Sequence, residues 1–330
     1  MSRKGRILVA RLGAIGDICM LMPIVQALSH HFDVDWLIRE SHAPLVQRFP
    51  EIACRLVPAR VGRDEDAPFS PDLVARLADE GYDCLLDFSH WTVITWLAER
   101  LLGIPVRAVT VDQPQDRLLG IAVDPERQAQ AFNCLVPVPS MLHQHDKWCV
   151  LVKAALGVEV EPEWALPARP LINRDRPLRI FLHPNASKPE KLWRAKNFAA
   201  VIAGLARRRR VHCIVNLAER KIARELRWRL LFSRAGMEYA ALDPSFMGLQ
   251  AALENSDIAL GCDSGPMHFA SLSGVPSLVI YGRYPAAEFG PRWRSVAVSP
   301  PDLGLPADCI PVSRVDTALE RLVATLTDAP

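Results

Sequence analysis

The sequence predicts an α/β protein with two domains, each built on a parallel sheet. At 330 residues the chain exceeds the usual size of one domain. In both halves short apolar runs alternate with helical patterns, as expected for parallel strands with helices on both faces. A polar, proline-bearing stretch separates the halves, and with 50% hydrophobic residues each half can bury its own core.

In the first half, an apolar run over 7–10 predicts a strand, and a glycine-bearing loop and a helix to about residue 30 follow it. The same patterns predict a strand over 34–38, a helix over 71–80, a strand over 84–88 and a helix over 93–102. The stretch 164–177 has the composition of a linker. We therefore place the domains at 1–170 and 171–330.

The alternating pattern starts again after the linker. It predicts strands over 178–182, 211–215, 258–261 and 277–281, and helices over 195–207, 219–232, 249–255 and 265–272.

Composition narrows the class of function. The 39 Lys and Arg nearly balance the 37 Asp and Glu, so we expect no nucleic-acid partner. The eight cysteines form no C-x-x-C pair, which favours reduced thiols over a zinc site. No signal-peptide core and no apolar run of about 18 residues is present, so we expect a cytoplasmic protein.

Ligands of open parallel sheets bind at the carboxyl ends of the strands, and three loops are expected there. The first, over 11–17, contains Gly13 and Gly16, which let the backbone turn tightly and approach a ligand. It lacks the final glycine spacing of a dinucleotide-binding fingerprint. Judged by this loop alone, Asp17 is better interpreted as a carboxylate that complements the dipole of the next helix.

The second loop, over 183–193, follows the first strand of the second half. Asn185, Ser187 and the two lysines at 188 and 191 offer hydrogen-bond donors and positive charge, which a diphosphate requires. The alternative is a polar loop that caps the helix near residue 195. Between these two interpretations, the order of the residues in the loop over 183–193 favours ligand binding.

The third loop, over 261–268, joins an apolar strand to a helix rich in small residues. Ser264 suits the N-cap and Pro266 the first helical turn, so free N–H groups would be available to a phosphate. Asp263 lies just beyond the strand and His268 on the first turn, where each could meet a sugar or phosphate oxygen.

Two segments suggest a metal site. Asp64, Glu65 and Asp66 match the D-x-D pattern by which some sugar transferases hold a divalent cation, but they lie in a charged loop that no strand precedes. His143 and His145 are better interpreted as part of a polar helix start. We expect no metal and no cofactor.

Together the three loops resemble the motifs of the glycosyltransferase family 9 heptosyltransferases, in order along nearly the whole chain. The first motif covers residues 6–17 together with Met22 and Pro23. The second covers 183–187 and 191–193. The third covers 263–265, His268, 274–276 and 281–282. It implies a GT-B fold, in which two Rossmann-like domains with parallel sheets face each other across a cleft. The N-terminal domain would bind the acceptor and the C-terminal domain the nucleotide-sugar donor, ADP-heptose.

The resemblance also implies an inverting, metal-independent transfer in which Asp17 is the base that takes the acceptor proton. Lys191 would neutralise the departing diphosphate, helped by Asn185, Ser187 and the amides near Ser264 and Gly265. Asp263 would contact the donor sugar and His268 the phosphates, and Glu219 would reach the adenosine ribose.

The implied acceptor is the lipopolysaccharide core or lipid A-Kdo, so we expect weak peripheral association with the inner membrane. Trp91, Trp96 and Arg100 are candidate contributors, or else core and helix-surface residues. Met20 stands where many relatives have His, and 87–91 replaces a segment that usually reads Asp-Leu-Gln-Gly.

Three alternatives remain open. The same fold could transfer another nucleotide-activated sugar or use a non-lipopolysaccharide acceptor. The first loop alone would also suit a dinucleotide-dependent oxidoreductase. A non-catalytic nucleotide-sugar binding protein would use the second and third loops without turnover.

Overall fold

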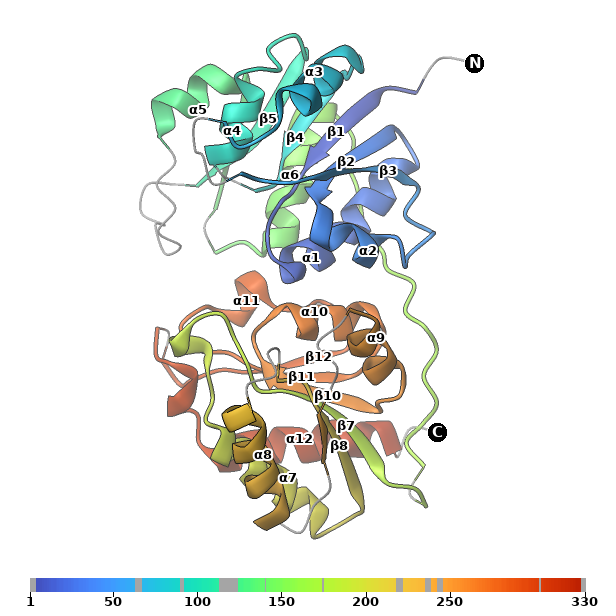
Figure 1. The fold of residues 1–330 in the computed structure, drawn as a ribbon, viewed down its shortest axis with the longest axis vertical. Coiled ribbons are helices and arrows are strands. Elements are labelled where there is room, and N and C mark those ends of the chain that lie inside the picture. Colours follow the sequence, from blue (N-terminus) through green and yellow to red (C-terminus); the bar gives the residue numbers. More distant parts are fainter. Residues whose placement is uncertain are drawn as a thin grey trace. The chain divides into compact units, whose positions relative to one another are not determined.

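A computed structural model describes residues 4–62, 67–89, 92–112, 124–139, 141–173, 175–217, 222–234, 239–241, 246–302 and 304–327. The chain forms two compact units, Met1–Trp164 and Ala165–Pro330 (Figure 1). The division falls six residues before the boundary expected from composition. Residues 158–173, on either side of the division, contain no helix or strand.

The first unit is a parallel sheet with helices on both faces (Figure 1). Its strands are β1 (Arg6–Ala10), β2 (Asp33–Arg39), β3 (Cys54–Ala59), β4 (Cys84–Asp87), β5 (Val106–Asp112) and β6 (Cys134–Val138). Its helices are α1 (Ile15–Ser29), the 3-10 turn η1 (Glu40–His42), α2 (Ala43–Val46), α3 (Pro71–Asp79), α4 (Thr92–Ala98), α5 (Pro125–Ala131) and α6 (Gln144–Leu156).

Alternation along the strands supplies both faces of this sheet with apolar side chains. In β1, Leu8 and Ala10 belong to a cluster with residues of α3, α4 and α5. On the opposite face, α1 packs against β2 and β3, and α6 against β4, β5 and β6. Helix α1 continues through Pro23, which lies in its interior and is buried.

The second unit repeats this plan. Its strands are β7 (Leu178–His183), β8 (Val211–Val215), β9 (Tyr239–Ala241), β10 (Ile258–Cys262), β11 (Ser277–Ile280) and β12 (Ser295–Val298). Its helices are η3 (Pro189–Lys191), α7 (Ala195–Ala206), α8 (Ile222–Arg234), α9 (Phe246–Glu254), α10 (Gly265–Leu272), α11 (Ala286–Phe289), η4 (Ala307–Cys309) and α12 (Val312–Thr327).

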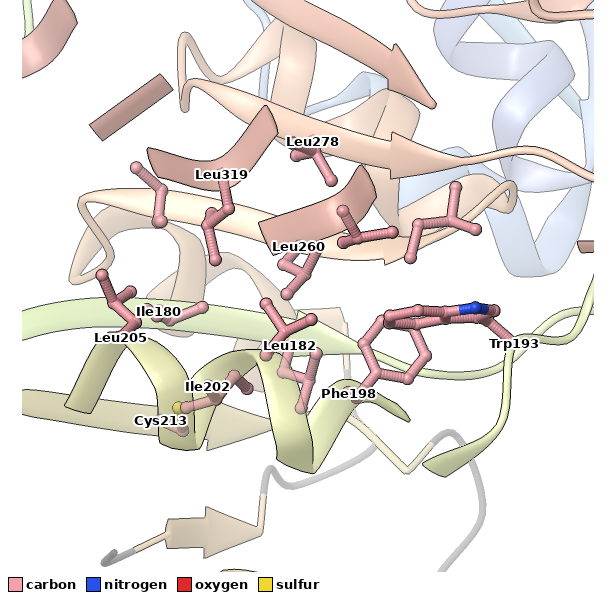
Figure 2. Close-up of a cluster of buried hydrophobic side chains, with 14 of the residues drawn as sticks. Ile180, Leu182, Trp193, Phe198, Ile202, Leu205, Cys213, Leu260, Leu278 and Leu319 are labelled. Carbon is pink, nitrogen blue, oxygen red and sulfur yellow. The ribbon is translucent and has the colours of Figure 1, made fainter. Parts of the chain in front are cut away.

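The main core of the second unit lies between its sheet and helices α7, α8 and α12. Figure 2 shows Leu182, Leu260 and Leu278 from three strands, with Leu319 of α12 packed over them. All four side chains are fully buried. Burial of each side chain of this size contributes about 1.5–3 kcal/mol, so the sheet and its helices are held together mainly here.

Strand order shows where a ligand would bind. The orders are β3-β2-β1-β4-β5-β6 and β12-β11-β10-β7-β8-β9, with every pair parallel. Counted within each unit, both are the doubly wound order 3-2-1-4-5-6. The chain reverses direction across the sheet between β1 and β4 and between β7 and β10. Loops beyond the carboxyl ends of these strands are therefore the expected ligand sites.

The α/β fold class predicted from the sequence is confirmed. The expected strand over 211–215 and helix over 265–272 have the bounds of β8 and α10, and the other expected elements in the described ranges shift by a few residues. Residues 219–221 of the expected helix 219–232 lie outside those ranges. The sequence analysis predicted only the start of α6, and it did not predict β3, β5, β6, β9, β12, α2, α5, α11 or α12.

Trp96 does not lie on an exposed surface. It is 7% exposed and belongs to the core cluster of the first unit, and the Arg100 guanidinium lies over its ring, 3.4 Å from the centroid. For Trp96 the core is therefore the correct alternative, whereas Arg100 is exposed just beyond the end of α4 and its two alternatives stay open. Trp91 lies outside the described residues.

Two further observations concern the cysteines and the helices. All eight cysteines are free, and Cys19, Cys84, Cys213 and Cys262 are buried. Among the described residues, no helix has both the length and the apolar character needed to cross a membrane.

Candidate active site

Asp17 lies in the first turn of α1, directly after the loop that leaves β1. Its Oδ2 accepts a hydrogen bond from the Ala14 backbone N–H at 2.9 Å, and its Oδ1 lies 2.9 Å from Nη2 of Arg11. The carboxylate thus satisfies a free amide at the positive end of the helix, as the dipole interpretation expects. Since 30% of the side chain remains exposed, a ligand hydroxyl can still reach it.

The other partners of Arg11 fix its position. Its Nη1 donates to the Phe88 carbonyl, and the guanidinium lies over the Trp148 ring at 5.3 Å from the centroid. Arg11 is only 8% exposed. A Cβ on Gly13 would lie 2.3 Å from Oδ2 of Asp17 and 3.0 Å from Nε of Arg11, so a side chain at position 13 would displace the Asp17 carboxylate from its present position.

Asp87 ends β4, the strand across the switch point from β1. It is 1% exposed, and its Oδ1 accepts hydrogen bonds from the backbone N–H of Ser89 at 2.7 Å and from the Ser89 hydroxyl at 2.5 Å. Met20, in α1, is 7% exposed and forms part of the core. Residues 90 and 91 lie outside the described ranges.

In the second unit, Lys191 and Asp263 meet although 72 positions separate them in the sequence. Nζ of Lys191 lies 2.6 Å from Oδ2 of Asp263, and the side chains are 18% and 3% exposed. Lys191 follows β7 and Asp263 follows β10, the two strands at the switch point. The second and third loops predicted from the sequence therefore form one site.

Trp193 fixes the end of the lysine-bearing loop. It is 2% exposed, its Nε1 donates to the Ile310 carbonyl at 2.9 Å, and its ring meets Phe198 edge to face at 4.9 Å (Figure 2). Its backbone N–H points to Sγ of Cys262, the residue before Asp263. Lys191, two residues earlier, is thereby held next to the end of β10.

Ser264 occupies the N-cap of α10, as the sequence predicts, but its hydroxyl makes no capping hydrogen bond. Its Oγ is buried and has no hydrogen-bond partner within the described part of the chain. The N–H groups of the first turn, which begins at Gly265, are therefore not used by a side-chain cap. A buried hydroxyl beside uncapped amides suits a phosphate oxygen.

The remaining predicted residues differ in their surroundings. Asn185 donates through Nδ2 to the Asn216 carbonyl at 2.9 Å, whereas Ser187 is exposed. His268 is 6% exposed in α10, and Gly16 is buried in the first turn of α1. Glu219 lies outside the described residues.

The two metal hypotheses have different outcomes. Asp64, Glu65 and Asp66 lie outside the described ranges. His143 is the N-cap of α6 and accepts from the His145 N–H at 3.1 Å, which agrees with a polar helix start. In the part of the chain that the structure covers, no three His, Cys, Asp or Glu side chains are grouped as metal ligands.

Two large cavities lie away from these loops. One of about 500 Å³ is lined by Asp257, Pro276 and Ser295, which precede or begin β10, β11 and β12. The other, of about 620 Å³, lies between β12 and α12. The first is at the amino ends of the strands, opposite the edge where doubly wound sheets bind ligands.

Burial shifts the pKa of two groups beside the site. It raises the pKa of Tyr281 well above its usual value, an effect that the nearby Asp263 strengthens. It also lowers the pKa of His183, the last residue of β7, to about 4. Both side chains are therefore neutral at pH 7.

The buried histidine predicts a pH dependence of stability. Because the folded-state pKa is about 4 and the ordinary value is 6.5, only the unfolded chain binds this proton at intermediate pH. The contribution of His183 to the free energy of unfolding is therefore fully present above pH 6.5. It should fall by about 3 kcal/mol as the pH drops toward 4. We expect His183→Gln to lose less stability over this range, measured by urea unfolding. An equally steep loss in the variant would show that His183 is not the cause.

Known proteins are similar to this chain in sequence and in fold. A model of glycosyltransferase family 9 (heptosyltransferase) matches residues 134–301. The lipopolysaccharide core heptosyltransferase OpsX of Haemophilus influenzae is 22% identical over 290 residues, which covers 83% of this chain and 78% of that protein.

Solved structures extend the likeness over nearly the whole chain. The E. coli ADP-heptose lps heptosyltransferase II superposes with a TM-score of 0.71 at 17% identity, covering 97% of this chain and 99% of that one. The E. coli heptosyltransferase WaaC with ADP gives a TM-score of 0.69 at 16% identity, covering 96% and 99%.

The two doubly wound units have the GT-B fold of the heptosyltransferase structures that they resemble. The chain belongs to glycosyltransferase family 9, the heptosyltransferases, because the family model matches half of its length. The resemblance and the enzyme class expected from the sequence are thus confirmed.

Proposed function

We propose that this protein transfers heptose from ADP-heptose to a lipopolysaccharide core or lipid A-Kdo acceptor. The observation that carries the proposal is the Lys191–Asp263 ion pair beside the uncapped N-terminus of α10. A cation and the amides near Ser264 and Gly265 at one switch point suit a nucleoside diphosphate. The similarity to OpsX and to WaaC with ADP supports this choice of donor and acceptor.

The donor would be held through its phosphates and sugar. Lys191 would neutralise the diphosphate, with the amides near Ser264 and Gly265 and the Ser187 hydroxyl as hydrogen-bond donors. His268 would contact the phosphates. Asp263 would accept from a hydroxyl of the heptose, and Asn185 would support the loop through its bond to Asn216. For Glu219 we keep the assignment to the adenosine ribose.

The transfer would be a single inverting displacement. The acceptor oxygen attacks the anomeric carbon and gives its proton to Asp17, while the bond to the diphosphate breaks and ADP leaves with the electron pair. Lys191 and the α10 amides would supply the positive charge that a metal provides in other transferases. We therefore propose a metal-independent reaction without a cofactor.

Calorimetric titration with ADP, UDP and NAD, each with and without EDTA, tests the donor assignment. We expect ADP to bind and to retain its affinity in EDTA. A preference for UDP would replace the donor while keeping the class of enzyme. A preference for NAD, or a loss of ADP binding in EDTA, would contradict the proposal.

An amphipathic acceptor at the inner membrane would require a cytoplasmic enzyme that reaches the membrane surface. We propose weak peripheral association, without the contribution of Trp96 that the sequence suggested, because that side chain is buried. Flotation with anionic liposomes at low salt tests this. Absence of binding there would contradict it.

A further inference from the structure

Two lysines of the loop after β7 contact one aromatic ring, that of Tyr284, which follows β11. Nζ of Lys188 donates a hydrogen bond to the Tyr284 hydroxyl and lies 4.8 Å from the ring centroid. Nζ of Lys191 lies over the same ring at 4.7 Å from its centroid and also pairs with Asp263. One tyrosine therefore holds two lysines of the loop after β7.

The position of the ring is fixed by its surroundings. Tyr284 is 5% exposed and meets Phe289 edge to face at 6.4 Å. A Cβ on Gly282 would lie 2.1 Å from the Glu190 carbonyl oxygen, so the backbones of the two loops are in direct contact. The ring and the lysines thus keep their relative positions without a ligand.

The charges of this cluster do not balance. Lys191 has Asp263 as its carboxylate partner. Lys188 contacts the hydroxyl and the ring of Tyr284, and within the described ranges it makes no ion pair. Two ammonium groups held together with one carboxylate leave a net positive charge, which favours an anion at this point.

We propose that Lys188 is a second cation for the diphosphate of the donor, and that Tyr284 is a positioning residue that holds Lys188 and Lys191 at one anion site. This inference rests on the proposed function. An ammonium group offers three donors to phosphate oxygens. When the donor binds, a phosphate oxygen replaces the Tyr284 hydroxyl as the acceptor for Lys188.

The test compares ADP with AMP, because only ADP has the second phosphate. We expect Lys188→Met to weaken ADP binding about tenfold, the usual size for loss of one charge-assisted hydrogen bond, and AMP binding by less than about twofold. Tyr284→Leu should weaken ADP binding in the same selective way. Tyr284→Phe keeps the ring and should have a smaller effect.

Lys196→Met is the matched control, since Lys196 is an exposed lysine in the first turn of α7. It removes the same charge and should leave the ratio of ADP to AMP affinity unchanged. Thermal unfolding of each variant checks that it is folded. An unchanged ratio in Lys188→Met, an equal loss of both nucleotides, or an unaffected Tyr284→Leu would overturn the inference. Wild-type protein that binds no ADP would instead contradict the proposed function.

Discussion

Asp17→Asn should lower the transfer rate about a thousandfold while leaving ADP affinity within about twofold of the wild-type value. The amide oxygen can still accept from the Ala14 N–H, so the start of α1 is preserved. The amide cannot take the acceptor proton, however, and the reaction loses its base. Initial rates at saturating ADP-heptose and acceptor, together with an ADP titration, measure the two quantities.

The control for this variant is Asp72→Asn, which changes a carboxylate in the first turn of α3. It tests whether loss of a helix-start charge alone affects the rate, and we expect wild-type activity. If Asp17→Asn retained a rate within about threefold of wild type, Asp17 would not be the base. Its contacts with Ala14 and Arg11 would then be structural.

Lys191→Met should lower the transfer rate about a hundredfold, because the leaving diphosphate loses a cation in a largely buried site. It should also reduce the free energy of unfolding by about 2 kcal/mol, since Asp263 is 3% exposed and would lose its ion-pair partner. Initial rates measured well below the midpoint of thermal unfolding separate the first effect from the second.

The double variant Lys191→Met with Asp263→Asn identifies the origin of the stability loss. Removing the buried charge should restore most of the free energy of unfolding without restoring the rate. Lys191→Arg keeps the positive charge and should retain more activity than Lys191→Met. A Lys191→Met enzyme with wild-type kcat would exclude a role in stabilising the leaving group.

The sequence predicted most accurately those helices and strands whose start and end signals lie next to them in the chain. Strand β8 is a short apolar run between two polar stretches, and α10 has Ser264 and Pro266 at its start and a glycine just beyond its end. Strands β3 and β6 were missed because both contain a proline, which counts against a strand in a sequence pattern. Each of them lies at an edge of the first sheet, where a missing N–H is tolerated.

The sequence predicts those site residues that come directly after a strand. The rule that ligands bind beyond carboxyl ends selected Lys191 and Asp263, and the structure pairs them. Applied once more, to the strand over 277–281, the same rule would have selected Tyr284. The role of Arg11 had no such signal, because its partner Trp148 is 137 positions away and only the folded sheet brings them together.

The anchoring of Trp193 links the affinity for the donor to the packing of the core beneath this side chain. Because Trp193 packs against Phe198 and bonds to Ile310, the loop that carries Lys188 and Lys191 loses its conformational entropy when the protein folds. The donor then meets a loop that is already ordered, and more of the contact energy is retained as affinity. A change in the core beneath Trp193 would therefore alter nucleotide affinity by loosening this loop, without contacting the nucleotide.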